Sequence, residues 1–135
     1  MEYKKIILNR SFYIRDTSRV AKDLLGKVLV KESGGNKVSG IIVETEAYYG
    51  PGDPASHASG GPTPRSRVMF GKAGIAYVYL CYGVYWLLNI VTEEKTIPGA
   101  VLIRGYAEKE KDRRYRPKAD RWSRKAYYCH GYRLF

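Results

Sequence analysis

The chain has 135 residues, enough for one domain with a modest core, and nothing in it indicates two. Its 24 Lys and Arg residues outnumber its 13 Asp and Glu residues, giving a formal net charge of +11. This balance favours a polyanionic partner, with nucleic acid before anionic membrane; a merely basic protein is the alternative. The two cysteines fit neither a disulfide framework nor a zinc-ligand spacing, which excludes those two classes of small scaffold.

The N-terminal segment MEYKKIILNRSF is too short and too charged for a signal peptide or a membrane span. No apolar run elsewhere reaches the length that a membrane-spanning helix needs. We therefore expect a soluble intracellular protein with no membrane partner.

The first elements predicted along the chain are a helix and a β-hairpin. Residues 16–27 have a capping Asp or Thr, an apolar stripe at helical spacing and a terminating glycine, so they predict a short helix. The stripe consists of Val20, Ala21, Leu24 and Leu25. Residues 27–32 predict a strand, SGGNK predicts a turn, and residues 38–49 predict the returning strand.

The returning strand, VSGIIVETEAYY, has an unusual alternation. With a period of two, one face would carry Ile42, Glu44, Glu46 and Tyr48. Two carboxylates and a tyrosine would then precede a Pro/Gly-rich loop that ends at His57. A carboxylate beside an aromatic ring in a cleft can act as a general base, whereas glutamates on an open sheet face are usually only solvated. Residue type alone leaves both interpretations open.

The segment GGPTPRSRVMFG predicts a short helical segment. Thr63 is its candidate cap, Pro64 occupies its first position, and Gly71 ends it. Arg65 and Arg67 fall within this segment.

The segment GIAYVYLCYGVYWLLNIV predicts two strands joined by a tight turn at Tyr82 and Gly83. A large aromatic side chain at an exposed turn is hard to explain by packing, and such side chains can wedge between stacked base pairs. Tyr77 and Tyr79 share one face, where core packing would explain them. Asn89 interrupts an apolar run, so its amide must find partners or line a cavity; a satisfied structural amide is the simpler interpretation.

Residues 99–107 predict a last strand, which carries Arg104. From Lys109 to Phe135 there are ten Lys and Arg residues against three Asp and Glu residues, no Ile or Val, and a single Leu. Such a segment can bury little apolar surface, so it predicts a disordered or loosely docked basic tail. The aromatic residues interleaved with its cations would suit contact with a phosphate backbone or with bases. The alternative, that the tail has no selected role, is equally consistent with the sequence.

Together these motifs resemble the alkyladenine DNA glycosylases, also called 3-methyladenine or methylpurine DNA glycosylases. The matching blocks run from about Leu8 to Glu108: VAKDLLGKVLV, IVETEAYYGPGDPASH, TPRSRVMFG, AYVYLCYGVYWLLNIV and GAVLIR. We expect an α+β fold, a single domain with a curved antiparallel β-sheet core, a DNA-intercalating β-hairpin and a few peripheral helices. The expected glycosylase domain, residues 1–108, is C-terminally incomplete relative to the family, and residues 109–135 form a divergent or frameshifted basic tail.

The resemblance implies roles for the residues around the proposed base site. Glu46 corresponds to the general base that activates the attacking water, and Arg104 to an arginine near that water and the DNA backbone. Tyr48, His57 and Tyr79 correspond to the residues that sandwich the flipped base, and the His57 region also offers the base a hydrogen bond.

The resemblance also implies which residues discriminate between bases and contact DNA. Tyr82 matches the residue that enters the minor groove and fills the vacated stack. Asn89 matches the amide that disfavours normal guanine by crowding its exocyclic amino group. The family approaches DNA at the positions of Arg65, Arg67 and Met69.

The implied activity is that of a base-excision-repair enzyme, a monofunctional purine DNA N-glycosylase. It would flip alkylated or deaminated purines out of duplex DNA and hydrolyse the N-glycosidic bond, leaving an abasic site. Neither a metal nor another cofactor is expected. Its partner would be double-stranded DNA containing damaged purines, bound by a monomer in the cytoplasm and nucleoid or in the nucleus. The alternative is a non-catalytic or inactive truncated nucleic-acid-binding protein.

Overall fold

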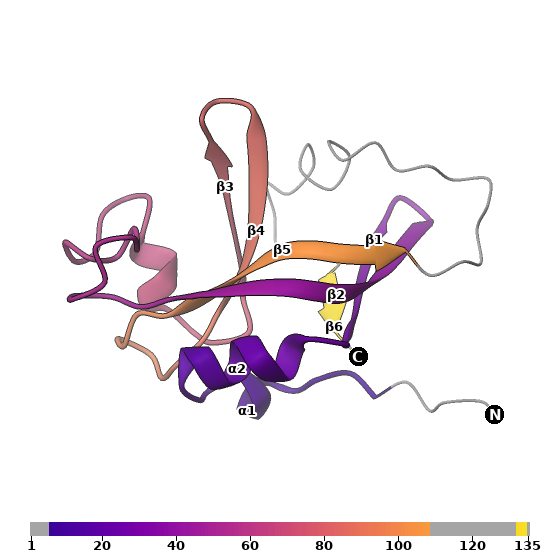
Figure 1. Cartoon of the computed structure of the whole chain (residues 1–135), viewed down its shortest axis with the longest axis horizontal. Helices are drawn as coiled ribbons and strands as arrows, with labels where there is room; N and C mark the ends of the chain where they lie inside the picture. The colour runs from indigo at the N-terminus through magenta and orange to yellow at the C-terminus, as the bar shows by residue number, and fades with distance from the viewer. Residues whose placement is uncertain (1–5, 109–131, 135) are drawn as a thin grey trace.

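The computed structural model describes residues 6–108 and 132–134, which form one antiparallel sheet with two short α-helices along one face (Figure 1). The six strands lie in the order β3-β4-β5-β2-β1-β6. The elements are α1 (Arg10–Tyr13), α2 (Thr17–Leu24), β1 (Val28–Ser33), β2 (Asn36–Tyr48), the 3-10 helix η1 (Arg67–Phe70), β3 (Ala76–Cys81), β4 (Tyr85–Val91), β5 (Ala100–Glu108) and β6 (Tyr132–Leu134). The predicted α+β fold with a curved antiparallel sheet is confirmed. No helix in the described ranges is long and apolar enough to cross a membrane.

The α2 helix begins and ends close to where the sequence predicts. The Asp16 side chain accepts a hydrogen bond from the Arg19 backbone N–H, which makes Asp16 the N-cap. Leu25 was expected in the apolar stripe, but it is 46% exposed. The helix ends at Leu24 and the backbone is already extended at Leu25, so the Leu25 side chain leaves the helical face. The residues buried beneath α2 are Val20, Ala21 and Leu24.

The N-terminus of α2 is fastened to the loop between β4 and β5. The Glu93 carboxylate accepts hydrogen bonds from the Thr17 backbone N–H at 2.7 Å and from the Thr17 hydroxyl at 2.8 Å. Glu93 has a φ of +67°, a conformation that disfavours non-glycine residues. Its bonds to the helix offset that backbone strain and hold the end of β4 against α2.

The pairing of β2 with β5 contains an irregularity that changes which side chains face the core. The register shifts on both sides of Glu44, between the pairs Ile42–Tyr106 and Thr45–Ile103. Ile42 and Ala47 are five positions apart, so strict alternation would place them on opposite faces. Both nevertheless pack in the core beneath the helices.

The prediction that Ile42 shares a face with the two glutamates and Tyr48 is therefore wrong at Ile42. The side chain of Ile42 is fully buried, and the Thr45 hydroxyl donates to the Ala21 carbonyl oxygen of α2 at 2.9 Å. Glu44 and Glu46 face the opposite side, where both approach Arg104. The break in alternation thus separates a core segment of β2 from a polar segment.

A second core lies on the face of the sheet opposite α2. Its buried residues are Ala58, Met69, Tyr77, Val91 and Ala100, with Val68, Phe70 and Tyr79 packed against them. The helical segment expected from Pro64 is shorter than predicted and begins at Arg67. Before it, the Thr63 hydroxyl accepts from the Ser66 backbone N–H at 3.1 Å, which forms a turn in place of the first helical residues.

The last described strand, β6, pairs with β1 from Lys31–Tyr132 to Leu29–Leu134. The sequence had indicated no strand in this part of the predicted tail. The rest of that tail, residues 109–131 and 135, lies outside the described residues.

The change of face at Glu44 predicts a large loss of stability on truncating Ile42 and almost none on truncating its neighbour Val43. Ile42→Ala should lower the free energy of unfolding by about 2–5 kcal/mol, because it empties a fully buried position. Val43→Ala is the matched control, since Val43 is 56% exposed and should change stability by no more than about 0.5 kcal/mol. Urea denaturation measures both; equal losses would contradict the assigned faces.

Candidate functional site

Four strands bring residues from distant parts of the sequence into one row on the sheet face opposite α2. Glu46 of β2 pairs with Leu102 of β5, Leu102 pairs with Asn89 of β4, and Asn89 pairs with Tyr77 of β3. Paired residues project their side chains to the same face. Neighbouring strands lie about 4.8 Å apart, so the row extends over roughly 14 Å.

The Glu46 carboxylate lies at one end of this row, with a partner for each oxygen. The Tyr48 hydroxyl donates to Oε2 at 2.5 Å, and Arg104 Nε lies 3.4 Å from Oε1. The side chain of Glu46 is 36% exposed, so solvent still reaches it. Arg104 Nε also lies 3.8 Å from Glu44 Oε1, but Glu44 is 62% exposed.

The hydrogen bond between Tyr48 and Glu46 strongly favours the protonated phenol. This bond, together with burial of the ring, raises the pKa of Tyr48 from 10.0 to about 12. Tyr48 is therefore a permanent donor to Glu46 at neutral pH. The carboxylate is held in one orientation by a neutral donor on one oxygen and a cation beside the other.

Next to this carboxylate lies a cluster of aromatic rings from the second core. The rings of His57 and Tyr79 are 4.5 Å apart between centroids at an angle of 67°, and those of Tyr77 and Tyr79 are 5.3 Å apart. The Arg65 guanidinium lies over the Tyr79 ring, 5.1 Å from its centroid. Burial, and then the positive charge of Arg65, lower the pKa of His57, so its imidazole is neutral at neutral pH.

The aromatic cluster lies close enough to the carboxylate for the charge of Glu46 to act on Tyr79. Burial, with the negative charge of Glu46 among the further causes, raises the pKa of Tyr79. Asn89 is 2% exposed, and its amide donates to the Tyr77 carbonyl oxygen at 3.3 Å. This bond gives Asn89 the structural partner that a buried amide requires, at a position flanked by the aromatic cluster and Leu102.

Tyr82 stands apart from this surface, at the tip of the β3–β4 hairpin (Figure 1). Tyr82 and Gly83 both have positive φ, as a two-residue turn that follows the strand twist requires. The Tyr82 side chain is 93% exposed. Val84 and Tyr85 beside it are each 66% exposed, so the hairpin ends in an apolar tip.

The structure thus divides the predicted site residues among four places. Glu46, Tyr48 and Arg104 form the carboxylate group; His57, Tyr79, Asn89 and Arg65 belong to the aromatic cluster; Tyr82 occupies the hairpin tip. Arg67 and Met69 lie on η1, where Arg67 is exposed and Met69 is buried in the second core.

Two members of the site were not among the predicted residues. Tyr77 was explained as core packing, although its alternation with Tyr79 already placed it on the site face. Leu102 fills the centre of the row and is 2% exposed, and only the strand pairing identifies it.

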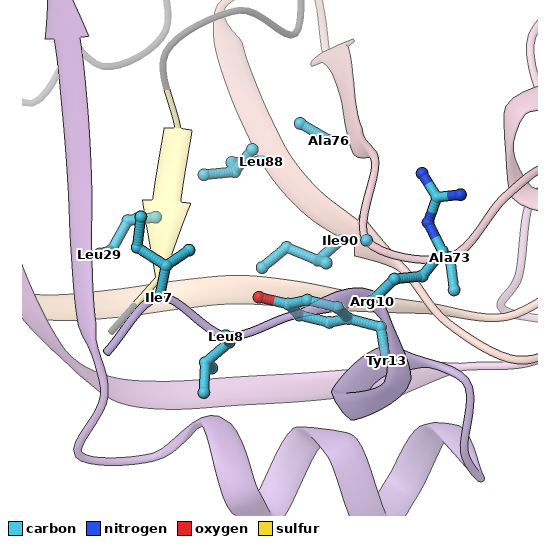
Figure 2. Close-up of a pocket in the computed structure, with 10 residues that line it drawn as sticks. Ile7, Leu8, Arg10, Tyr13, Leu29, Ala73, Ala76, Leu88 and Ile90 are labelled. Atoms are coloured by element: carbon cyan, nitrogen blue, oxygen red, sulfur yellow. The ribbon is translucent and has the colours of Figure 1, made fainter. Parts of the chain in front are cut away.

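A cavity of about 220 Å³ lies elsewhere, between the N-terminal segment and strands β1, β3 and β4 (Figure 2). Its lining includes Leu8, Leu29, Leu88 and Ile90, and none of the predicted site residues contributes to it. Leu88 and Ile90 alternate with Asn89 along β4, so this cavity opens on the opposite face of the hairpin from the aromatic cluster. Among the described residues, no group of three or more His, Cys, Asp or Glu side chains could hold a metal ion.

The family model described as "Methylpurine-DNA glycosylase (MPG)" matches residues 11–131 of the chain. The chain belongs to the methylpurine-DNA glycosylase family. The match includes both the carboxylate group and the aromatic cluster, so the family relationship and the clustered geometry concern the same residues.

Similar members of the methylpurine-DNA glycosylase family carry the name "Putative 3-methyladenine DNA glycosylase". One from Anaeromyxobacter sp. (strain Fw109-5) is 59% identical over 97 residues, covering 72% of this chain and 50% of the relative. One from Sodalis glossinidius is 61% identical over 99 residues, covering 73% and 56%. One from Methanocella arvoryzae is 58% identical over 98 residues, covering 73% and 49%. The chain spans about half the length of these relatives.

The pairing of Tyr48 with Glu46 predicts a late tyrosine titration. Because the folded-state pKa is raised, the contribution of this pair to stability is complete below about pH 10 and is lost as the pH rises toward 12. In an ultraviolet difference titration, Glu46→Gln should move the pKa of Tyr48 back toward 10, and Tyr48→Phe should remove this titration step. Tyr13, whose pKa burial raises to about 12, should titrate unchanged in both variants. A Tyr48 titration that Glu46→Gln leaves in place would contradict the assignment.

Proposed function

We propose that this chain excises damaged purines from duplex DNA by hydrolysing the N-glycosidic bond and leaving an abasic site. The observation that carries the proposal is the partly exposed Glu46 carboxylate, oriented by Tyr48 and Arg104 beside a cluster of aromatic rings. Membership of the methylpurine-DNA glycosylase family supports methylated purines as substrates.

The hairpin tip supplies what base extrusion requires. A stacked base is inaccessible to hydrolysis, and flipping it out of the duplex costs a few kcal/mol. The exposed Tyr82 ring can enter the minor groove and occupy the vacated stack, which offsets part of that cost. Tyr82 therefore acts on the DNA and leaves the chemistry to residues on the sheet.

The aromatic cluster supplies the walls of a base site. Tyr48 and Tyr79 can stack on an extruded purine, and the His57 ring, inclined at 67° to that of Tyr79, can meet the purine edge-on. An N-alkylated purine carries positive charge that such rings favour by about 1 kcal/mol. Asn89 would crowd the exocyclic amino group of guanine and so disfavour the normal base. Because Asn89 is bonded to the backbone of β3, its amide cannot move aside freely.

Glu46 supplies the base catalyst. It takes a proton from a water molecule as the water oxygen bonds to the anomeric carbon and the purine leaves with the electron pair of the N-glycosidic bond. Its negative charge also stabilises the positive charge that develops on the sugar. Tyr48 and Arg104 keep the carboxylate pointed at one place during this step.

The cations of the chain supply affinity for the phosphate backbone that does not depend on base sequence. Arg65 and Arg67 are exposed and can reach phosphate groups. Met69, buried beneath them, contributes by holding η1 against the second core.

Substitution of Glu46 should separate chemistry from binding. The wild-type chain should release hypoxanthine or 3-methyladenine from duplex DNA, and Glu46→Gln should slow release by about 10²- to 10⁴-fold while leaving DNA affinity unchanged. Glu44→Gln is the matched control, because Glu44 has the same chemistry two residues away and is expected to lie outside the reaction. Release is measured by cleavage of the abasic product in alkali.

The same assay tests the alternative that the chain only binds nucleic acid. Binding of duplex DNA with no base release by wild-type protein in excess over DNA would refute the catalytic proposal. Equal losses in Glu44→Gln and Glu46→Gln would refute the assignment of Glu46 as the base.

Removal of the hairpin wedge should weaken extrusion. Tyr82→Ala should slow base release by about 10-fold, because one stacked aromatic contact contributes about 1–3 kcal/mol. Ile97→Ala is the control, since Ile97 is also exposed but lies in the loop at the other end of β4. Single-turnover release rates measure the effect; an unchanged rate in Tyr82→Ala would exclude the wedge role.

A further inference from the structure

Tyr77 makes a contact that the proposed chemistry does not use. Its phenol oxygen lies 3.0 Å from Nδ1 of His57, within hydrogen-bond distance. The Tyr77 ring is buried in the second core, so the position of the phenol is fixed by packing. His57 lies in the loop after β2, and this hydrogen bond links it to β3 in addition to its ring contact with Tyr79.

The direction of this hydrogen bond decides what His57 can offer a ligand. Burial and the charge of Arg65 keep the imidazole neutral, so one ring nitrogen carries a hydrogen and the other is an acceptor. If the phenol donates to Nδ1, the hydrogen of the ring lies on Nε2. If Nδ1–H donates to the phenol oxygen, Nε2 becomes an acceptor.

The surroundings of Tyr77 favour the first arrangement. The phenol of Tyr77 carries one hydrogen, and Tyr77 is only 6% exposed, so that hydrogen needs an acceptor within the protein. Within the described part of the chain, Nδ1 of His57 is the acceptor that a contact places in reach of the phenol hydrogen. The opposite arrangement would leave this buried hydroxyl hydrogen without an acceptor, which is unfavourable.

We propose that Tyr77 is a positioning residue that holds His57 as the Nε2–H tautomer, so that His57 presents one hydrogen-bond donor to the extruded base. The contact that selects the tautomer is the one between the Tyr77 hydroxyl and His57 Nδ1. A purine is then selected by an acceptor on the edge that meets Nε2, such as a carbonyl oxygen or an unsubstituted ring nitrogen. This inference rests on the proposed function for its ligand, but the tautomer is a property of the free protein.

Nitrogen-15 NMR of the free protein tests the tautomer directly. The chain has two histidines, and a His130→Gln background leaves only the His57 resonances. Long-range nitrogen–proton correlations should show an unprotonated Nδ1 and a protonated Nε2, and Tyr77→Phe should shift both nitrogens toward a mixture of tautomers. Tyr13→Phe, which removes another buried phenol hydroxyl from the helix-side core, should leave them unchanged. A protonated Nδ1, or no response to Tyr77→Phe, would overturn the proposal.

Base release tests the consequence for a ligand. Tyr77→Phe keeps the ring in the core, and it should slow release of hypoxanthine by about 2- to 10-fold, the range expected for one net hydrogen bond. Tyr13→Phe should have no such effect. The two failures are distinguishable: the expected tautomer without base release refutes the proposed function alone, whereas release with a protonated Nδ1 refutes the role of Tyr77 alone.

Discussion

The pairing of β2 with β5, with its change of face at Glu44, is the constraint on which the rest of the structure depends. It lets one strand contribute Ile42 to the core under the helices and Glu46 to the polar surface on the other side. In a strictly alternating strand every second side chain lies on the same face, so Ile42 and Glu46 would share a face and one of them would be misplaced. The same stretch of β5 turns Arg104 toward the glutamates while Ile103 packs against the core. The break in alternation is therefore what allows a charged group to lie directly above a well-packed interior.

The second core lies on the same face of the sheet as the Glu46 carboxylate, so it also depends on the change of face in β2. Tyr77 and Val91 pack beneath the loop that carries His57, so a loop rich in glycine and proline is held by buried rings. Asn89, bonded to the carbonyl of Tyr77, fixes β4 to β3 where the aromatic cluster meets the row of paired residues. The side chains that pack the second core thus also fix the positions of the polar groups of the site. Tyr77 illustrates this, since its ring belongs to the core and its hydroxyl to the site.

Much of the fold could be predicted from the sequence, and the errors have identifiable physical causes. Local signals succeeded where the determinant is local: the Asp16 cap, the Gly34–Gly35 turn and the positive φ values at Tyr82 and Gly83 all depend on neighbouring residues. The face of Ile42 could not be predicted, because it depends on register with a strand some sixty residues away. The site residues remain predictions. Their clustering in space agrees with a common role, but Leu102 shows that pairing across strands adds members that no motif identifies.

The two glutamates of β2 show how position alone separates residues of identical chemistry. Both carboxylates approach Arg104, and alternation assigns both to one face, so neither type nor spacing distinguishes them. Glu46 accepts a hydrogen bond from the Tyr48 hydroxyl, and its side chain is 36% exposed against 62% for Glu44. Glu44 lies at the shift in register, opposite Gly105, which offers no side chain to cover it. An oriented, half-shielded carboxylate can hold one water molecule in a defined place, whereas a solvated one competes with bulk water for every contact. The shift in register at Glu44 therefore favours Glu46 over Glu44 for the proposed general-base role.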